Sequence, residues 1–372
     1  MRPYVRMLGL ALGVMTAVVA PAAPAAASDA VVGPGESIQA AIDDAQPGDT
    51  VLVAAGEFHE NLTITTDDLT LRGAGSGRHG TVLMPSSSST ASPCADAPPD
   101  TTQGICVHGA MPVASGAPVR GVTIEDLTVD GFSGSGIYAF HAEDYTVAHV
   151  RARMNGGYGI AGFVQSGVQM LGSVAIDNGE PGIYIGDSPD AEAVVIGNTA
   201  IRNGIGGEGF GFLLRDASHG QVLGNKATGN CVGFVFIDHG FNPVEPFSDW
   251  TAKGNTANRN NGACPASAEF PAFSGTGMLL GGTHGVVLAG NHVFGNRPTI
   301  EASMAGGIVV VSTKSLGGAE PTDNVVSRNV AFHNKPADIV WDGSGTGNRF
   351  SHNLCAASTP AGFCNDSGGP AT

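Results

Sequence analysis

The stretch that decides the fold is NKATGNCVGFVFI, residues 225–237. Two asparagines, Asn225 and Asn230, stand five residues apart, and an apolar run that begins at Gly233 follows them. The same spacing recurs in Asn198…Asn203, Asn255…Asn260, Asn291…Asn296, Asn329…Asn334 and Asn348…Asn353. A spacing of five that recurs in six pairs indicates an internal repeat rather than accidental enrichment in Asn.

The length of the repeat indicates its architecture. From Asn155 onward the second asparagine recurs after 23, 25, 27, 30, 36 and 38 residues. A unit of this length, with short strands and tight turns, suits one coil of a parallel β-helix, whose coils stack about 4.8 Å apart. Asn suits the turn because it tolerates left-handed backbone and can bond to the equivalent Asn one coil away. The longer units predict loop insertions at 241–276 and 297–306, which in solenoids often wall a binding face.

Composition agrees with a turn-rich solenoid and excludes other classes. Gly accounts for 56 of 372 residues, only 13% of residues are charged, and the net charge is −16. The Gly content argues against a helical protein, and the absence of a three-residue period argues against collagen. The acidic balance argues against a nucleic-acid partner. The low charge density and 42% hydrophobic residues argue against disorder.

Residues 1–27 have the pattern of a secretory signal peptide. Arg2 and Arg6 precede an apolar segment from Met7 to Ala20, and small residues end at Ala27. We therefore expect a secreted protein without a membrane span, because the apolar run is shorter than the ~20 residues that a spanning helix needs. Loss of this leader leaves 15 basic against 33 acidic residues, a net charge of −18.

The six cysteines of an exported chain predict disulfides. The simplest of the fifteen possible connectivities pairs neighbours: Cys94 with Cys106, Cys231 with Cys264, and Cys355 with Cys364. A metal site is the alternative, but no two of these cysteines form a C-x-x-C motif. We predict no cysteine metal site.

The N-terminal region adds a family resemblance. VGPGESIQAAIDDAQPGDTVLV (32–53) predicts a short helix with Ser37 as its N-cap, placed to cover the first coil, and GEFHENLTI (56–64) follows. Together these segments resemble the start of right-handed parallel β-helix proteins with the pectate-lyase-like fold and the carbohydrate-binding and sugar-hydrolase repeat. The resemblance covers about residues 31–356. It implies an all-β, right-handed solenoid of about 9–11 coils at 28–356, and we expect a flexible tail at 357–372.

Alignment of the Gly-initiated strands places three acids in one column. Asp187, Asp216 and Asp238 each stand five residues after the glycine of consecutive repeats. Neighbours in such a column lie about 5 Å apart, which would raise the pKa of one carboxyl so that it could act as an acid. The same separations suit a glycoside hydrolase, and the column could instead hold Ca²⁺. A third interpretation is that Asp merely favours the turn that ends each strand.

Other polar and aromatic residues extend this candidate site. Arg215, His239 and Lys314 could supply the cation and the base that a uronate lyase or epimerase needs. FIDHG (236–240) partly resembles the Asp-x-His cluster of mannuronan C5-epimerases and alginate lyases of this fold. For substrate binding we expect Tyr138, Tyr184, His219 and His284. Strict alternation along a strand would put the Tyr and Asp columns on opposite faces unless the chain turns first.

These observations predict a secreted, monomeric β-helix whose partner is a polysaccharide. The favoured activity is that of a lyase or C5-epimerase on an extracellular acidic glycan. The alternatives are a glycoside hydrolase that uses the stacked Asp carboxylates and a non-catalytic glycan-binding solenoid at the cell surface.

Overall fold

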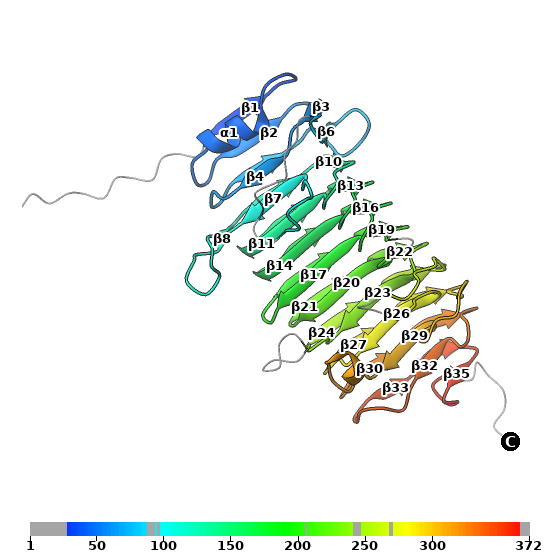
Figure 1. The fold of residues 1–372 in the computed structure, drawn as a ribbon. Coiled ribbons are helices and arrows are strands. Elements are labelled where there is room, and N and C mark those ends of the chain that lie inside the picture. The colour runs from blue at the N-terminus through cyan, green and yellow to red at the C-terminus, as the bar shows by residue number, and fades with distance from the viewer. Residues whose placement is uncertain are drawn as a thin grey trace, which may run out of the picture.

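The computed structural model describes residues 28–87, 94, 97–204, 207–240, 247–267 and 271–364. Three parallel sheets of 12, 11 and 12 strands run the length of these residues, and each coil contributes one strand to each sheet (Figure 1). We name them sheets A, B and C in the order in which a coil visits them. The prediction of an all-β parallel β-helix is confirmed. The predicted leader, 1–27, lies outside the described residues.

The strands of sheet A are β1 (Asp29–Val32), β2 (Thr50–Val53), β5 (Thr70–Arg72), β9 (Thr123–Glu125), β12 (Thr146–Ala148), β15 (Gln169–Leu171), β18 (Ala193–Ile196), β21 (Gly220–Leu223), β24 (Trp250–Lys253), β27 (Val287–Ala289), β30 (Val325–Ser327) and β33 (Arg349–Ser351). Those of sheet B are β3 (Gly56–His59), β6 (Thr81–Met84), β10 (Leu127–Asp130), β13 (Arg151–Arg153), β16 (Val174–Ile176), β19 (Thr199–Ile201), β22 (Lys226–Thr228), β25 (Thr256–Asn258), β28 (His292–Phe294), β31 (Val330–Phe332) and β34 (Leu354–Cys355).

The strands of sheet C are β4 (Leu62–Ile64), β7 (Ile105–His108), β11 (Ile137–Glu143), β14 (Ile160–Ser166), β17 (Ile183–Ser188), β20 (Phe210–Ala217), β23 (Val232–Ile237), β26 (Thr276–Gly281), β29 (Gly306–Val311), β32 (Ile339–Trp341) and β35 (Ser358–Thr359). A two-residue strand, β8 (Val119–Arg120), pairs in parallel with the end of β11 and is the twelfth strand of this sheet. Sheet C faces the viewer in Figure 1, and its longer strands give it the widest outer surface.

The core consists of columns of identical position in successive coils. Parallel pairing in register places one apolar side chain from each strand of sheet C directly over the next, in the order Ile137, Ile160, Ile183, Phe212, Phe234, Met278, Ile308 and Ile339. All are at most 2% exposed. Because no single coil can bury this face, the hydrophobic effect stabilises the stack as a whole.

Two asparagine ladders explain the five-residue spacing. In five of the six pairs the first asparagine precedes a sheet-B strand, and the second follows that strand after one intervening residue. The pair Asn348…Asn353 flanks the sheet-A strand β33 instead, and Asn353 joins the first ladder by accepting from Asn329. In the second ladder the backbone N–H and Nδ2 of Asn230 both donate to Oδ1 of Asn260, at 3.2 and 3.0 Å. Nδ2 of Asn260 also donates to the carbonyl of Ala227. The side-chain oxygen and both side-chain N–H donors of such a buried amide are therefore hydrogen-bonded. These bonds tie the turn of one coil to the turns of the two neighbouring coils.

The N-terminal helix α1 (Ile38–Asp44) covers the first coil as predicted (Figure 1). Ser37 is its N-cap, with Oγ accepting from the N–H of Ala40 at 3.2 Å. Glu60 adds a second cap by accepting from the N–H of Ile38 at 2.7 Å. Ile38 and Ile42 are buried, so the helix seals the core where no preceding coil exists.

The solenoid extends past the boundary at residue 356. Strand β35 pairs with β32, and the ring of Phe363 stacks on that of Phe350 at 4.1 Å between centroids. A disulfide joins Cys355 to Cys364. The predicted flexible tail at 357–372 is therefore wrong for residues 357–364, which complete the last coil, because Phe363 and Cys364 close the open end of the core. Residues 365–372 lie outside the described part.

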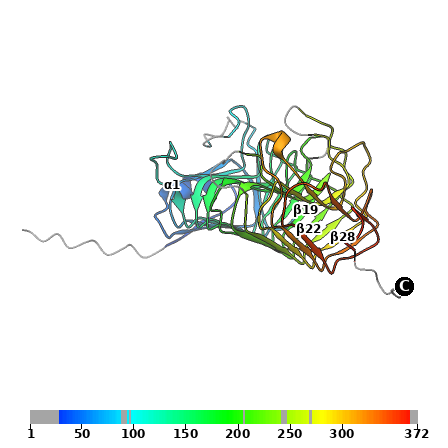
Figure 2. The ribbon, with the colours of Figure 1, turned by 90° about the horizontal axis from the view of Figure 1, so that it is seen from below.

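Inserted loops gather on the outer side of sheet C. Figure 2 shows them rising from one side of the solenoid, among them the short helix η1 (Lys314–Leu316). The other two disulfides, Cys94–Cys106 and Cys231–Cys264, tie inserted loops to strand β7 and to the start of β23. Disulfides thus join neighbouring cysteines throughout, and two of them fix the walls of the sheet-C face.

We expect Asn260→Ala to destabilise the protein by about 2–4 kcal/mol, because it leaves the two donors of Asn230 buried without an acceptor. Asn258→Ala is the matched control, since Asn258 lies two residues earlier on the outer face of β25 and is only partly buried. Chemical unfolding of both variants tests this expectation. Equal midpoints for the two variants would show that the ladder contributes nothing beyond the strand pairing.

Candidate active site on the outer face of sheet C

The Asp column lies where the strands of sheet C bend. Asp187 and Asp216 have left-handed backbone, with φ of 51° and 49°, and so do His141 and Val164 at the same position of earlier coils. Such a residue interrupts the alternation of a strand, as a β-bulge does. The side chains of Asp187 and Asp216 therefore lie on the same outer face as the residue that precedes each of them. This turn removes the conflict that strict alternation predicted between the Tyr and Asp columns.

Arg215 is the cation of this face. It occupies the outward column of Phe140, Phe163 and Gly186, one residue before Asp216. Its guanidinium carbon lies 5.5 Å from the ring centroid of Tyr184, a cation–π contact. Asp187 and Asp216 both interact electrostatically with it. The structure therefore brings together Arg215, Tyr184, Asp187 and Asp216, four residues that the sequence singled out.

Gly186 is essential to that arrangement. A Cβ at this position would collide with the phenol oxygen and Cζ of Tyr184, because the tyrosine ring lies across the glycine toward Arg215. The neighbouring coils carry Phe163 and Arg215 at this column. The glycine thus supplies the gap into which the ring of Tyr184 fits.

A second tyrosine, Tyr158, belongs to this group although it is not among the site residues predicted from the sequence. Its ring packs on Tyr184 at 4.9 Å and on Phe163 at 5.8 Å between centroids. Burial raises the pKa of both the Tyr158 and the Tyr184 phenols, and the charges of Glu180 and Glu208 add to the effect at Tyr158. Both phenols are therefore neutral hydrogen-bond donors at physiological pH.

Tyr158, Glu180 and Glu208 share one signal that the sequence offered. Each lies in the turn between the second asparagine of a repeat and the strand of sheet C. Alignment of that turn, rather than only of the strands, would have placed them together. Glu180 and Glu208 line a cavity of about 390 Å³ on one side of the tyrosines. A second cavity of about 310 Å³, lined by His141 and Asp187, lies at the end where the strands bend.

Asp216 is the acid of this group whose pKa is raised by its surroundings. Burial raises its pKa above the ordinary value of an aspartate, and the charges of Asp238 and Asp187 act in the same direction. The N–H of His239 and the charge of Arg215 oppose this increase. Oδ1 accepts from the N–H of His239 at 2.7 Å. Oδ2 is buried without a hydrogen-bond partner among the described residues. A proton on Oδ2 would therefore be retained to a higher pH than on an exposed carboxyl.

Asp238 continues the column, but structural contacts use much of its bonding capacity. Its Oδ1 accepts from the N–H of Gly240 at 2.8 Å, and its carbonyl accepts from Oγ1 of Thr313 at 2.7 Å. It is 4% exposed. The turn interpretation of Asp thus describes Asp238 better than it describes Asp216. His239 follows it and is half-buried.

Three predicted site residues have other contacts. Nζ of Lys314 bonds to Glu320 at 2.7 Å in the loop that contains η1. Nδ1 of His219 bonds to Asp190 at 3.1 Å. Nδ1 of His284 bonds to Oγ1 of Thr322 at 2.8 Å. The structure shows no contact between these three side chains and the group around Arg215 within the part of the chain that it describes.

The predicted aromatic platform is covered. Tyr138 is 4% exposed, because the loop fixed by Cys94–Cys106 packs on it, and its ring stacks on Phe163 at 4.9 Å. Tyr184 is fully buried. Neither tyrosine offers an open ring face to a sugar in this structure, because the inserted loops and the neighbouring rings cover them.

No three His, Cys, Asp or Glu side chains of the described residues are arranged to hold a metal ion. Over the same residues, no helix is long and apolar enough to cross a membrane.

The family model described as "Right handed beta helix region" matches residues 60–209 and 100–248, which together span just over half of the chain. The chain belongs to this family. The match agrees with the three parallel sheets and with the handedness that the N-terminal resemblance implied. No curated protein matches the chain in a sequence comparison.

Solved structures with this fold come from several enzymes. The A-module of mannuronan C-5 epimerase AlgE4 of Azotobacter vinelandii aligns with a TM-score of 0.56 and 19% identity, over 86% of this chain and 95% of that one. The periplasmic alginate epimerase AlgG aligns at 0.53 and 14%, over 88% and 84%. DFA-IIIase of Arthrobacter chlorophenolicus A6, without its lid, aligns at 0.52 and 12%, over 87% and 94%. At these identities the likeness shows the fold.

We expect Asp216→Asn to stabilise the protein at neutral pH by about 0.5–2 kcal/mol, as single stabilising substitutions commonly do. The folded pKa of Asp216 is raised, so its carboxyl costs stability once pH exceeds that pKa, and the amide avoids this cost. The gain should vanish below pH 3.8, where folded and unfolded chains are both protonated. Denaturant unfolding at pH 7, 5 and 3 measures it.

Asp144→Asn is the control for this measurement, because Asp144 also has a left-handed φ but is exposed. It should change stability by no more than about 0.5 kcal/mol at any pH. A gain for Asp216→Asn that is equally large at pH 3 would contradict the buried-carboxylate explanation.

Proposed function

We propose that this chain is a secreted, carbohydrate-active enzyme that acts on an extracellular acidic polysaccharide as a lyase or C5-epimerase, through the outer face of sheet C. The observation that carries the proposal is the half-buried Arg215, held between Tyr184 and the carboxyls of Asp187 and Asp216. A cation next to an acid with a raised pKa suits a proton transfer at the carbon atom beside a substrate carboxylate. The disulfides and the leader-like N-terminus support export.

The chemistry begins with charge neutralisation. The C5 proton of a uronate residue is difficult to remove while the adjacent carboxylate keeps its charge, because the carbanion that forms would add a second negative charge. Arg215 stays protonated and can bind a carboxylate with two parallel N–H donors. Pairing with Arg215 would disperse the charge that develops on the substrate when the C5–H bond breaks.

The carboxyls of this face fit the two proton transfers. The Asp187 carboxyl, which interacts electrostatically with Arg215, would take the C5 proton, with His239 as an alternative base. In a lyase the C5–H electron pair forms the C4=C5 bond, the C4–O4 bond breaks, and protonated Asp216 supplies the proton that O4 needs. In an epimerase the same acid would return a proton to the opposite face of C5, and no bond of the chain would break.

The solved neighbours include epimerases that act on mannuronan and alginate, and this supports the substrate class by analogy of fold alone. The mature chain carries a net charge of −18, which disfavours a polyanion in general. Arg215 provides local compensation at the place where the reaction would occur.

A glycoside hydrolase is the second candidate, and Asp216 favours it too. Adjacent carboxyls about 5 Å apart, one of them protonated, match the spacing of a retaining hydrolase. Products separate the two activities. A lyase creates an unsaturated uronate that absorbs ultraviolet light, a hydrolase creates reducing ends without that absorbance, and an epimerase changes the C5 configuration with the chain length unchanged.

We expect Asp216→Asn to lower turnover at least about 100-fold, the usual contribution of a positioned acid, while Asp144→Asn keeps full activity. Wild-type turnover should fall as pH rises through the raised pKa of Asp216, because the acid must be protonated. Arg215→Gln should impair turnover of uronates more than Arg120→Gln, which removes an exposed arginine. A panel of uronate and neutral polysaccharides, analysed by absorbance, reducing ends and NMR, provides the assay.

Two outcomes would contradict the proposal. Full activity in Asp216→Asn would remove the Asp column from catalysis. Inactivity of the wild type on the whole panel, together with retained glycan binding, would favour a non-catalytic binding solenoid.

A further inference from the structure

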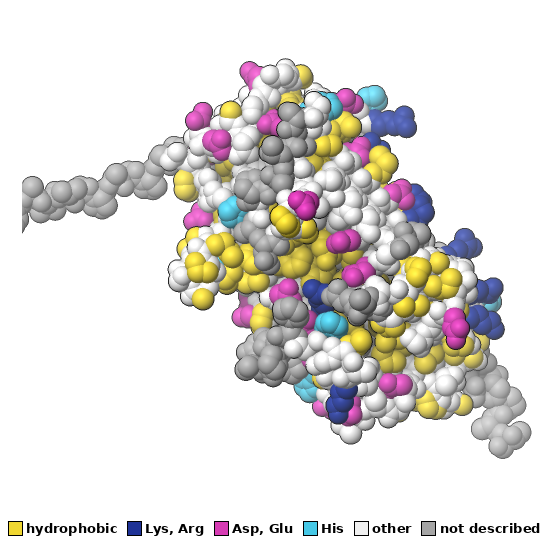
Figure 3. Space-filling model, in the orientation of Figure 1, with side chains coloured by type: hydrophobic (Ala, Val, Ile, Leu, Met, Phe, Trp, Pro, Cys, Tyr) yellow, Lys and Arg dark blue, Asp and Glu magenta, His cyan; other side chains and the backbone are white. Residues whose placement is uncertain are grey.

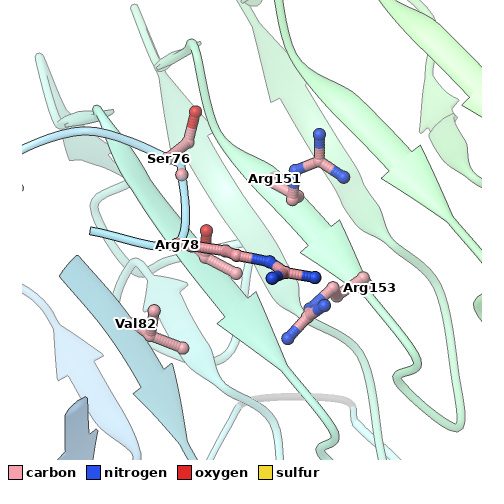
Figure 4. Close-up of a pocket in the computed structure, with 7 residues that line it drawn as sticks. Ser76, Arg78, Val82, Arg151 and Arg153 are labelled. Carbon is pink, nitrogen blue, oxygen red and sulfur yellow. The ribbon is translucent and has the colours of Figure 1, made fainter. Parts of the chain in front are cut away.

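Sheet B carries a concentration of arginines that the sheet-C site does not use. Arg78 extends from the loop between β5 and β6, and Arg151 and Arg153 project from β13 (Figure 4). The three side chains line one pocket of about 300 Å³, together with Ser76 and Thr128. Three guanidinium groups in one pocket are unusual in a chain with only 17 Lys and Arg against 33 Asp and Glu.

The pocket is electrically unbalanced. The acid that contacts it is Asp130, whose side chain is 4% exposed and whose Oδ2 accepts from Nη2 of Arg153 at 2.5 Å. Within the described residues, Arg78 and Arg151 have no acidic side chain at ion-pair distance, and Nε of Arg153 is buried without a hydrogen-bond partner. Glu57 stands one coil before Val82 in the same column but does not line the pocket. Three cations against one carboxylate leave an excess positive charge that an anion would offset.

The imbalance continues along the same edge. An arginine stands in or beside every second strand of sheet B: Arg78 precedes β6, Arg153 is the last residue of β13, and Arg202 and Arg259 directly follow β19 and β25. Two coils advance about 10 Å along the axis. Figure 3 shows the resulting row of basic groups down the edge of the molecule on which sheet B lies in Figure 1.

A second basic pocket lies toward the C-terminal end of the row. Arg259, Arg297 and His333 line a cavity of about 360 Å³. Arg202, between the two pockets, is bound by two hydrogen bonds to Asp177 and so contributes less free charge. The two pockets lie four coils apart, or about 20 Å, with the long axis of the solenoid joining them.

We propose that this edge of sheet B is a binding track for an acidic polysaccharide, anchored in the pocket of Arg78, Arg151 and Arg153 and held again at Arg259 and Arg297. Arginine pairs bind carboxylate or sulfate oxygens with two N–H donors, and the hydroxyls of Ser76 and Thr128 add neutral donors. A linear polyanion along the axis meets cations at regular intervals, whereas a single small anion would use one pocket only.

The proposal takes its ligand class from the proposed function but names a site on a different sheet. Occupation of both pockets by one chain raises the effective concentration of the second contact. The track would thus hold the polymer beside the sheet-C face, and it would compensate locally for the acidic net charge of the protein.

Binding of labelled oligogalacturonate, dextran sulfate and neutral dextran to the full mature chain tests the track. We expect the double variant Arg78→Gln/Arg151→Gln to bind the polyanions about ten- to hundredfold more weakly, the range for loss of charge-assisted hydrogen bonds. Arg153 is left in place because Asp130 is buried against it. Arg259→Gln/Arg297→Gln should also weaken binding, and wild-type affinity should fall with salt.

The matched control is Arg72→Gln/Arg349→Gln, which removes the same charge from sheet A and should bind like the wild type. Preference for oligogalacturonate or for dextran sulfate identifies carboxylate or sulfate as the recognised group. Equal losses in the sheet-A and sheet-B variants, equal binding of neutral dextran, or no binding of either polyanion would overturn the proposal. Turnover of a short uronate that reaches only sheet C should survive in the sheet-B variants, which separates failure of the track from failure of the catalytic site.

Discussion

In-register stacking of each coil on the next is the constraint on which the rest of the structure depends. A strand of sheet C pairs residue for residue with its neighbours, so any position of the repeat becomes a column in space. The column interior is apolar because no coil buries its face alone. The turn columns are asparagine because a buried amide can satisfy its own coil and the next at once. The register therefore determines both what is buried and which polar groups meet.

The same register creates the functional surfaces. Asp187 and Asp216 are brought together because both occupy the left-handed position at the end of a sheet-C strand. Arg215 lies beside them because it is one residue earlier on the same strand, and Gly186 one coil before it leaves the space that Tyr184 fills. The row of arginines on sheet B follows from the same principle. Arg202 and Arg259 occupy the same position of the repeat two coils apart, and Arg153 stands one position earlier in its own coil, so their charges lie in a line along the axis.

The inserted loops add what the repeat lacks. Disulfides at Cys94–Cys106 and Cys231–Cys264 hold loops against sheet C, and these loops remove Tyr138 and Phe210 from solvent. Burial in turn shifts titration, since the raised pKa of Asp216 and of the two tyrosines comes first from desolvation. The repeats thus position the reacting groups, while the irregular segments between them set the local environment.

The sequence by itself determined the periodic features. Asparagines five residues apart, glycines at strand starts and apolar runs specified the coils, the capping helix with Ser37, and the Asp column, because these depend on local spacing that stacking repeats unchanged. The tertiary structure alone decided the rest. Whether Tyr138 faces solvent, whether Lys314 reaches Arg215 and whether Tyr158 joins the site depend on how loops of unequal length fold back over the sheet, and no period encodes that path. The last coil was misjudged for the same reason, since Phe363 is recognisable as core only once Phe350 lies beneath it.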